Sequence, residues 1–203
     1  TILGHGIVVS SYGSEILTDW GCLYTNIGGT DTVIGSGENN TNLILSGCQN
    51  SGIAADFCAN FSSNGYDDWY LPSKNELELF HSTIVSTNTW NNTPFRTNHD
   101  KYWSSSEDNF LNSWVVDFDF WMSGGIVYPY SSNPSSLELK NSLCYVRPVR
   151  SFSYSPNYLA FVNTSGWNYL LATDSTGCTY DSIYVQLNIG GCMDPAATNF
   201  DST

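Results

Sequence analysis

The sequence predicts an α+β fold with two main helices, twisted antiparallel sheets and a C-terminal β-hairpin module. Apolar residues recur at helical spacing in residues 53–61 and 77–84, whereas they occupy alternate positions in residues 114–121. Two consecutive glycines, at positions 124 and 125, interrupt the alternating pattern as a hairpin turn does. A chain of 203 residues can bury one core and a second small module.

The first third of the chain predicts one strand and two helices. "GIVVSSY" (6–12) is typical of a short strand, and "NIGGTDT" (26–32) of a glycine-rich turn. A short helix is expected in "ENNTNLILSGC" (38–48), closed by Gly47, and a better-defined helix in "GIAADFCANFSSNGY" (52–66), which Gly65 can end. The second helix carries one apolar stripe: Ile53, Ala54, Phe57, Cys58 and Phe61.

The acidic stretch "DDWYLPSKNELELF" (67–80) predicts the start of a further helix rather than a catalytic centre. Ser73 and Glu76 have the spacing of a capping box, in which each side chain accepts a hydrogen bond from the backbone amide of the other residue. Glu78 is then a solvated charge near the helix N-terminus. The helix is expected to bury Leu77, Phe80 and Ile84 on one face. Paired-carboxylate catalysis needs two acids that converge on a cleft, and this stretch supplies no such pair.

From residue 101 the pattern predicts strands. "YWSSSE" (102–107) opens them, with Trp103 expected in the core, and "SWVVDFDFWMSGGIVYPY" (113–130) predicts a hairpin around Ser123-Gly124-Gly125. The expected core face carries Trp114, Val116, Phe118 and Phe120. The other face is half-polar and expected to be exposed, with Val115, Asp117, Asp119 and Trp121. A further strand, "CYVRPVRSF" (144–152), contains Pro148, which indicates a free edge or a bulge.

Beyond residue 152 the sequence predicts a small β module. "WNYLLATDSTGCTYDSIYVQLNI" (167–189) is typical of strand, turn and strand, with alternating apolar residues at Ile183, Val185, Leu187 and Ile189. This segment is too short for an autonomous sandwich, so the hairpin either leans on the first domain or ends a truncated one. The predicted boundaries are 1–152 for the main domain, 153–190 for the hairpin module and 191–203 for the start of a short repeat.

The charge balance excludes several classes of partner. Nineteen Asp and Glu against six Lys and Arg give a net charge of −13, which repels phosphate backbones, anionic lipids and sulfated glycans. We therefore expect no nucleic-acid partner. No stretch approaches the roughly 20 apolar residues that span a bilayer, so direct membrane insertion is not expected. The chain begins at Thr1 without Met, which suggests a piece of a larger protein whose export signal lies elsewhere or has been removed.

Six cysteines make an even count: Cys22, Cys48, Cys58, Cys144, Cys178 and Cys192. None lies in a CxxC pair and no histidine flanks them, so zinc spacing is absent. Disulfides formed in an oxidising compartment are the better interpretation, which places the protein outside the cytosol. Six cysteines allow 15 connectivities, and spacing alone does not choose among them.

Several motifs occur in an order that resembles the Lcl C-terminal domain family. They are "HGIVVS", "WGC", "NIGGTDTVIGSGENNT", "GCQNSGIAADFCANFSSNGYDDWYLPSKNELELF", "YWSSSE" and "YVRPVRSF", and they cover residues 1 to about 152. The resemblance implies a secreted bacterial domain of C-type-lectin-like fold, related to formylglycine-generating-enzyme-like domains. The tail resembles modules of large surface adhesins of type 9-secreting, gliding bacteria. "LLATDSTGCTYDSIYVQLN" is similar to the last hairpin of their Ig-like repeats, and "GCMDPAATNFDST" to the start of a short Cys-Asp-Pro repeat.

The resemblance implies a disulfide pairing. In lectin-like folds a bridge commonly ties an early helix to the last strand, which implies Cys58 with Cys144. Cys22 with Cys48 would then close an N-terminal loop, and Cys178 would remain for Cys192, unless Cys192 pairs beyond Thr203. Cys144 stands alone in the late region where formylglycine-generating enzymes carry reactive cysteines, so a disulfide explains it better than catalysis.

The same resemblance implies where a ligand would bind. Lectin-like domains present their ligand face near the late hairpin, which makes Trp121, Tyr128, Tyr130 and Asp119 the candidate ligand-binding residues. Flat aromatic side chains suit sugar rings and protein hot spots, although the same residues can simply decorate an exposed sheet. The calcium-dependent sugar motif is not matched, because the nearest loop, Asn133-Pro134-Ser135, lacks an acid. No metal ion and no cofactor are therefore expected.

These observations predict a non-catalytic adhesion or recognition module of a large bacterial cell-surface protein. Its partner would be a glycan or protein on a surface, or neighbouring modules of the same protein. The alternative is a structural spacer in a surface filament or giant adhesin, with no soluble ligand. An aromatic surface covered by adjoining modules would favour the spacer, and an open one would favour binding.

Overall fold

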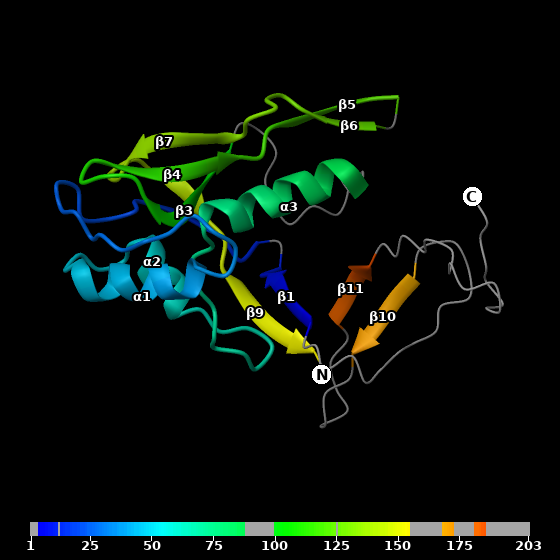
Figure 1. Cartoon of the computed structure of the whole chain (residues 1–203), viewed down its shortest axis with the longest axis horizontal. Coiled ribbons are helices and arrows are strands. Elements are labelled where there is room, and N and C mark those ends of the chain that lie inside the picture. The colour runs from blue at the N-terminus through cyan, green and yellow to red at the C-terminus, as the bar shows by residue number, and fades with distance from the viewer. Residues whose placement is uncertain are drawn as a thin grey trace, which may run out of the picture. The chain divides into compact units, whose positions relative to one another are not determined.

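The structure is a computed structural model that describes residues 4–11, 13–87, 100–124, 126–154, 168–172 and 181–185 (Figure 1). The chain divides into two compact units, one of Leu3–Tyr154 and one of Ser155–Thr203 with Thr1–Ile2. Among the described residues, no helix has both the length and the apolar character needed to cross a membrane.

In its described residues the first unit combines three helices with nine strands, as expected of an α+β fold. The helices are α1 (Gly37–Gly47), α2 (Ala54–Ala59) and α3 (Lys74–Thr87). The strands are β1 (Gly4–Val9), β2 (Ile16–Thr18), β3 (Lys101–Glu107), β4 (Asn112–Asp117), β5 (Phe120–Ser123), β6 (Ile126–Pro129), β7 (Ser135–Leu139), β8 (Cys144–Val146) and β9 (Val149–Tyr154). They form a five-stranded sheet in the order β2-β8-β3-β4-β7 and two ribbons, β1-β9 and β5-β6. All pairings are antiparallel except that of β3 with β8.

The helices begin and end largely where local sequence dictates. The predicted capping box of α3 is confirmed, since the Ser73 amide donates to Glu76 Oε2 (2.7 Å) and the Glu76 amide donates to Ser73 Oγ (3.3 Å). Gly47 ends α1 as predicted. The second helix is shorter than predicted, because it stops before Asn60, whose side chain donates to the Asp56 carbonyl (2.8 Å). Phe61 then leaves the helix and packs edge-on against Trp69.

The middle strands β3 and β4 of the central sheet are covered on both faces, which corrects the prediction of one exposed face. One core cluster joins Trp103, Val115 and Val146 to α1 and α2, through residues such as Ile44 and Ala55. The other core cluster lies on the opposite face: Leu77 and Ile84 of α3 with Tyr102, Val116, Phe118, Phe120 and Val127. Val115 is therefore core rather than surface, whereas the predicted core residue Trp114 is only half-buried. The prediction failed because alternation alone does not reveal a second covering layer.

Two further strand predictions are settled by the pairing. The predicted hairpin is confirmed, because Ser123 pairs with Ile126, with Gly124 at φ +59°. The expected single strand around Pro148 is instead two strands. β8 joins the central sheet, whereas β9 pairs with β1, and the break falls at Arg147 and Pro148, where a proline cannot continue the ladder.

The second unit contains an antiparallel pair, β10 (Asn168–Ala172) with β11 (Asp181–Val185). The two predicted strands are thus confirmed over these residues. Leu187, Ile189 and the proposed repeat start at 191–203 lie outside the described residues.

The cysteines only partly follow the predicted pairing. Cys22 and Cys48 form a disulfide with a Cα–Cα distance of 5.6 Å, as predicted. The predicted Cys58–Cys144 bridge is absent, and both residues are buried free thiols. They belong to the core cluster between the sheet and α1/α2, where each packs as a small apolar side chain. Cys178 and Cys192 lie outside the described residues.

Candidate functional site

One face of the β5–β6 ribbon gathers exposed aromatic side chains. Pairing places Trp121 opposite Tyr128, and their rings stack with centroids 4.7 Å apart and an interplanar angle of 23°. Alternation puts Ile126 on the same face as Trp121, and Tyr130 follows at the end of β6. Trp121 is 43% exposed and Tyr130 is 63% exposed. We call these four residues, Trp121, Ile126, Tyr128 and Tyr130, the aromatic face.

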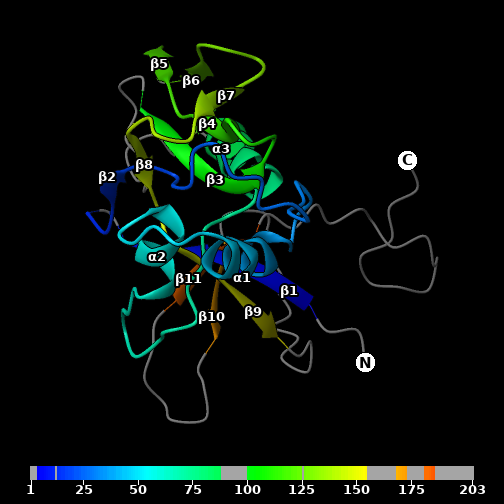
Figure 2. The same ribbon diagram turned by 90° about the vertical axis from the view of Figure 1, so that its left-hand side faces the viewer.

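The opposite face of the same ribbon is held against the unit's core. Phe120 and Val127 are almost fully buried in the cluster under α3, and the ring of His81 on α3 stacks on Phe120 with centroids 4.8 Å apart. In Figures 1 and 2 the ribbon lies on the far side of the central sheet from α1 and α2. The ribbon is therefore anchored through one face while the other face is presented to solvent.

The fourth candidate ligand residue, Asp119, does not share this exposure. Only 8% of Asp119 is accessible to solvent, and its carbonyl accepts a hydrogen bond from the Tyr130 amide (3.1 Å). We therefore leave Asp119 out of the aromatic face. Of the remaining three candidates, Trp121 and Tyr128 stack on each other, and Tyr130 follows directly after β6. Trp103, expected in the core, is fully buried there.

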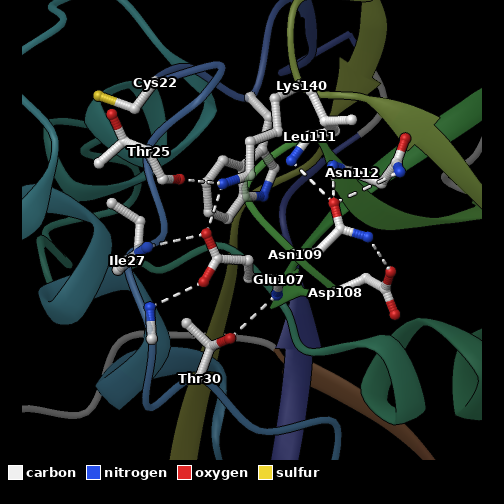
Figure 3. A network of polar contacts seen from close by, with 12 residues as sticks. Cys22, Thr25, Ile27, Thr30, Glu107, Asp108, Asn109, Leu111, Asn112 and Lys140 are labelled. Carbon is white, nitrogen blue, oxygen red and sulfur yellow. Dashed lines mark hydrogen bonds and ion pairs between the residues drawn. The ribbon is translucent and has the colours of Figure 1, made fainter.

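Sequence patterns did not reveal a buried ion pair that fixes the loops at one end of the central sheet (Figure 3). Lys140 and Glu107 form a salt bridge whose side chains are 0% and 3% exposed. Lys140 Nζ also donates to the Thr25 carbonyl (2.8 Å) and lies 4.5 Å from the centroid of the Trp20 ring. Glu107 accepts hydrogen bonds from the amides of Ile27 (2.9 Å) and Gly28 (2.7 Å).

A second buried pair joins Arg147 to Glu15, with both side chains almost fully buried. The guanidinium of Arg147 also donates to the Ser11 carbonyl, and the Tyr102 hydroxyl donates to Glu15 (3.1 Å). A buried charge needs a partner of this kind, so Arg147 is held beside the loop that links β1 to β2. The available signal was weak: a lone arginine within the apolar run "CYVRPV".

A comparison with protein-family models finds a match to the Lcl C-terminal domain over residues 36–150. The chain belongs to the Lcl C-terminal domain family. The matched segment of this Lcl C-terminal domain runs from just before α1 into β9 and includes the whole aromatic face as well as the Lys140–Glu107 pair. No curated protein shows significant similarity to the chain.

The two free thiols of the Lcl C-terminal domain have pKa values shifted by burial. Burial raises the pKa of Cys58 well above its ordinary value and raises the pKa of Cys144 to about 12. Both thiols therefore stay protonated near neutral pH, and a protonated thiol is a poor nucleophile. Among the residues described in 4–154, no three His, Cys, Asp or Glu side chains gather closely enough to hold a metal ion.

The buried acid Glu76 is occupied by the backbone. Beyond the Ser73 amide it accepts a hydrogen bond from the Gly35 amide (2.8 Å), and its side chain is fully buried. Burial raises the pKa of Glu76, against the opposing effect of the backbone amides of Ser73, Gly35 and Gly37. Glu76 therefore ties the 31–36 turn to the start of α3, in addition to its predicted capping role.

His81 predicts a pH-dependent stability of the Lcl C-terminal domain. Burial lowers the pKa of His81, and the nearby Glu78 carboxylate offsets this only in part. Below about pH 6.5 the unfolded chain binds this proton more readily than the folded chain. The His81 contribution to stability is therefore complete above pH 6.5 and is lost progressively, by at most about 1.4 kcal/mol per pH unit, until the lower folded-state pKa is reached.

Urea unfolding of the wild type and of the His81→Leu variant at pH 7.5 and pH 5.5 measures this contribution. The stability advantage of the wild type over the variant is expected to shrink, or to reverse, at the lower pH. Carboxylates other than Glu78, which interacts with His81, titrate alike in both proteins and cancel in the difference. A difference that stays constant between the two pH values would contradict the prediction.

Proposed function

We propose that the Lcl C-terminal domain of this chain is a non-catalytic recognition or adhesion module of C-type-lectin-like fold. In this proposal it is exported and displayed on a bacterial cell surface as part of a larger protein. The observation that carries the proposal is the open aromatic face, in which Trp121 and Tyr128 stack beside Ile126 and Tyr130. Exposed aromatic clusters on monomeric surfaces commonly mark interaction sites.

The scaffold beneath the aromatic face supports a binding role. A disulfide, two buried ion pairs and middle strands covered on both faces leave little freedom to lose when a partner binds. Preorganised contact residues lower the entropic cost of association. Two cross-strand aromatic rings that support each other are restricted in the same way.

The partner in this proposal is a glycan or protein on a surface. Trp and Tyr combine a large apolar area with few rotatable bonds, which suits the apolar side of a sugar ring or a protein hot spot. A net charge of −13 disfavours sulfated glycans and other polyanions. The absence of catalysis is also part of the proposal, supported by the buried, protonated thiols of Cys58 and Cys144.

The test is a binding screen with a matched tyrosine control. Fluorescently labelled full chain is applied to a glycan array and to intact bacterial and host cells, and hits are compared with the double variant Trp121→Ala/Tyr128→Ala. Loss of two hot-spot aromatics is expected to weaken binding by about thirtyfold or more. The control is Tyr24→Ala, because Tyr24 is 74% exposed.

Tyr24 is a suitable control because it lies far from the aromatic face. Its amide donates to the Phe110 carbonyl (2.8 Å), just before β4 begins, whereas β5 follows the end of β4. The six residues of β4 separate the two sites by roughly 20 Å. Equal loss of binding in the control and the double variant would argue against the aromatic face. No binding by the wild type would favour the structural spacer.

A further inference from the structure

The outer edge of the central sheet offers a row of backbone groups. β7 is the last strand of the order β2-β8-β3-β4-β7 and pairs with β4 on one side. Flanking hydrogen bonds fix which residues face β4: the Asp117 amide donates to the Pro134 carbonyl and the Lys140 amide donates to the Leu111 carbonyl, both at 2.9 Å. Because hydrogen-bonded and non-hydrogen-bonded pairs alternate in an antiparallel ladder, the backbone groups of three residues point away from β4. They are Ser135, Leu137 and Leu139.

Two of these three residues also expose large apolar side chains. Leu137 is 42% and Leu139 is 48% exposed. Leu137 lies opposite Trp114, which is half-buried, so its side chain continues the apolar surface on the side of the sheet that α3 covers. Ser135 lies on that side too, where its hydroxyl donates to Glu78 of α3 (2.6 Å). The outward backbone donors and acceptors of β7 therefore lie beside two exposed leucines, Leu137 and Leu139, which we call the aliphatic strip.

The usual protections of an edge strand are missing from β7. Natural edges are blocked by proline, by lysine, by an inward-pointing charge or by a bulge. The sequence of β7 is SSLEL, its pairing with β4 is regular, and its one charge, Glu138, points to the other side of the sheet, where Lys101 pairs with it. Among the residues that the structure describes, no other strand lies against this edge.

The charges around the edge indicate what kind of segment it accepts. Lys101 neutralises Glu138, and Lys74 neutralises Glu78 at 2.6 Å while lying 5.2 Å from the centroid of the Trp114 ring. The strip is thus locally neutral on a protein of net charge −13. A segment with uncharged, aliphatic residues at alternate positions matches this strip. Among the described residues, a strongly basic or acidic segment finds no unpaired charge beside the strip to attract it.

We propose that the outer edge of β7 binds an extended segment of another polypeptide as a sixth strand of the central sheet. The segment bonds to the outward N–H and C=O groups of Ser135, Leu137 and Leu139 and covers the two leucines with alternate aliphatic side chains. This surface is separate from the aromatic face, because the interaction uses the backbone of β7 and the strip beside it.

The probe is a capped peptide, acetyl-Thr-Val-Thr-Val-Thr-Val-Thr-amide, titrated into the ¹⁵N-labelled full chain. Binding in the high-micromolar range is expected, with slowed amide–water exchange at Ser135, Leu137 and Leu139. The amides of Ser136 and Glu138 already face β4, so their exchange should change little. The same peptide N-methylated at every residue has no backbone N–H left to donate to the edge and should not bind.

Two substitutions separate backbone from side-chain contributions. Leu137→Pro removes an outward N–H without removing a bond to β4, so the edge strand tolerates it, and peptide affinity should fall by about tenfold or more. Leu137→Ala keeps the backbone N–H, so its peptide affinity should fall less. Leu143 is an exposed leucine beyond the strand, and Leu143→Ala should leave the peptide affinity unchanged.

Three results would overturn the proposal. One is no binding of the peptide up to about 1 mM, the weak limit of a meaningful affinity. Another is equal binding of the N-methylated peptide to the wild-type chain, a comparison that depends on no variant. The third is amide protection that maps to the β5–β6 ribbon instead of β7.

Discussion

Replacing Lys140 with methionine is expected to lower the free energy of unfolding by about 3–5 kcal/mol, because the substitution leaves the Glu107 carboxylate buried without its cation. Methionine keeps most of the aliphatic volume of lysine, so the cavity term is small. Glu107 retains the amides of Ile27 and Gly28 as donors. Two hydrogen bonds do not compensate for a full buried charge. Chemical denaturation at pH 7 measures the change.

Lys101→Met is the matched control for this experiment. Lys101 pairs with Glu138 in the same sheet, but the two side chains are 36% and 27% exposed. Solvent screens such a pair, so the expected loss is about 0–1 kcal/mol. Equal losses in the two variants would show that burial of the Lys140–Glu107 pair does not determine its contribution.

Removing the Cys22–Cys48 bridge is expected to cost about 3 kcal/mol. The bridge joins residues separated by 26 positions, and closing a loop of this size restricts the unfolded chain by that amount. For a domain of this size the double variant Cys22→Ala/Cys48→Ala should melt about 6–12 °C below the wild type. Differential scanning calorimetry of both proteins provides the measurement.

The reducing agent gives the internal control for the bridge. Dithiothreitol should lower the melting temperature of the wild-type unit formed by Leu3–Tyr154 and leave that of the double variant unchanged. Cys58 and Cys144 are already free thiols, so reduction does not act through them. Identical melting of the reduced and oxidised wild type would refute the stabilising role of the disulfide.

Features with a local cause were predictable from the sequence. The capping box of Ser73 and Glu76 depends on four consecutive residues, and the turn at Gly124 depends on two. The aromatic composition of the β5–β6 ribbon was likewise visible, and the pairing of Trp121 with Tyr128 follows from the turn position. In each case the determining contacts lie within a short stretch of chain.

Features that depend on distant partners were not predictable. Val115 resembles a surface position in its own strand, and only the packing of α1 and α2 makes it core. The Cys58–Cys144 bridge was implied only by a resemblance to lectin-like folds, whereas here both thiols pack in the core. Lys140 and Glu107 are 33 positions apart, and no periodicity links them. The open edge of β7 also emerges only from the strand order.

The strand order has a consequence for how the domain is made. β8 lies between β2 and β3, although it follows them in the chain by more than 120 and by 37 residues respectively. During synthesis from the N-terminus, β2 has no neighbour in the sheet until residues 144–146 have left the ribosome. Such non-local closure slows folding. The central sheet of the nascent domain therefore stays incomplete over most of its translation and can close only late.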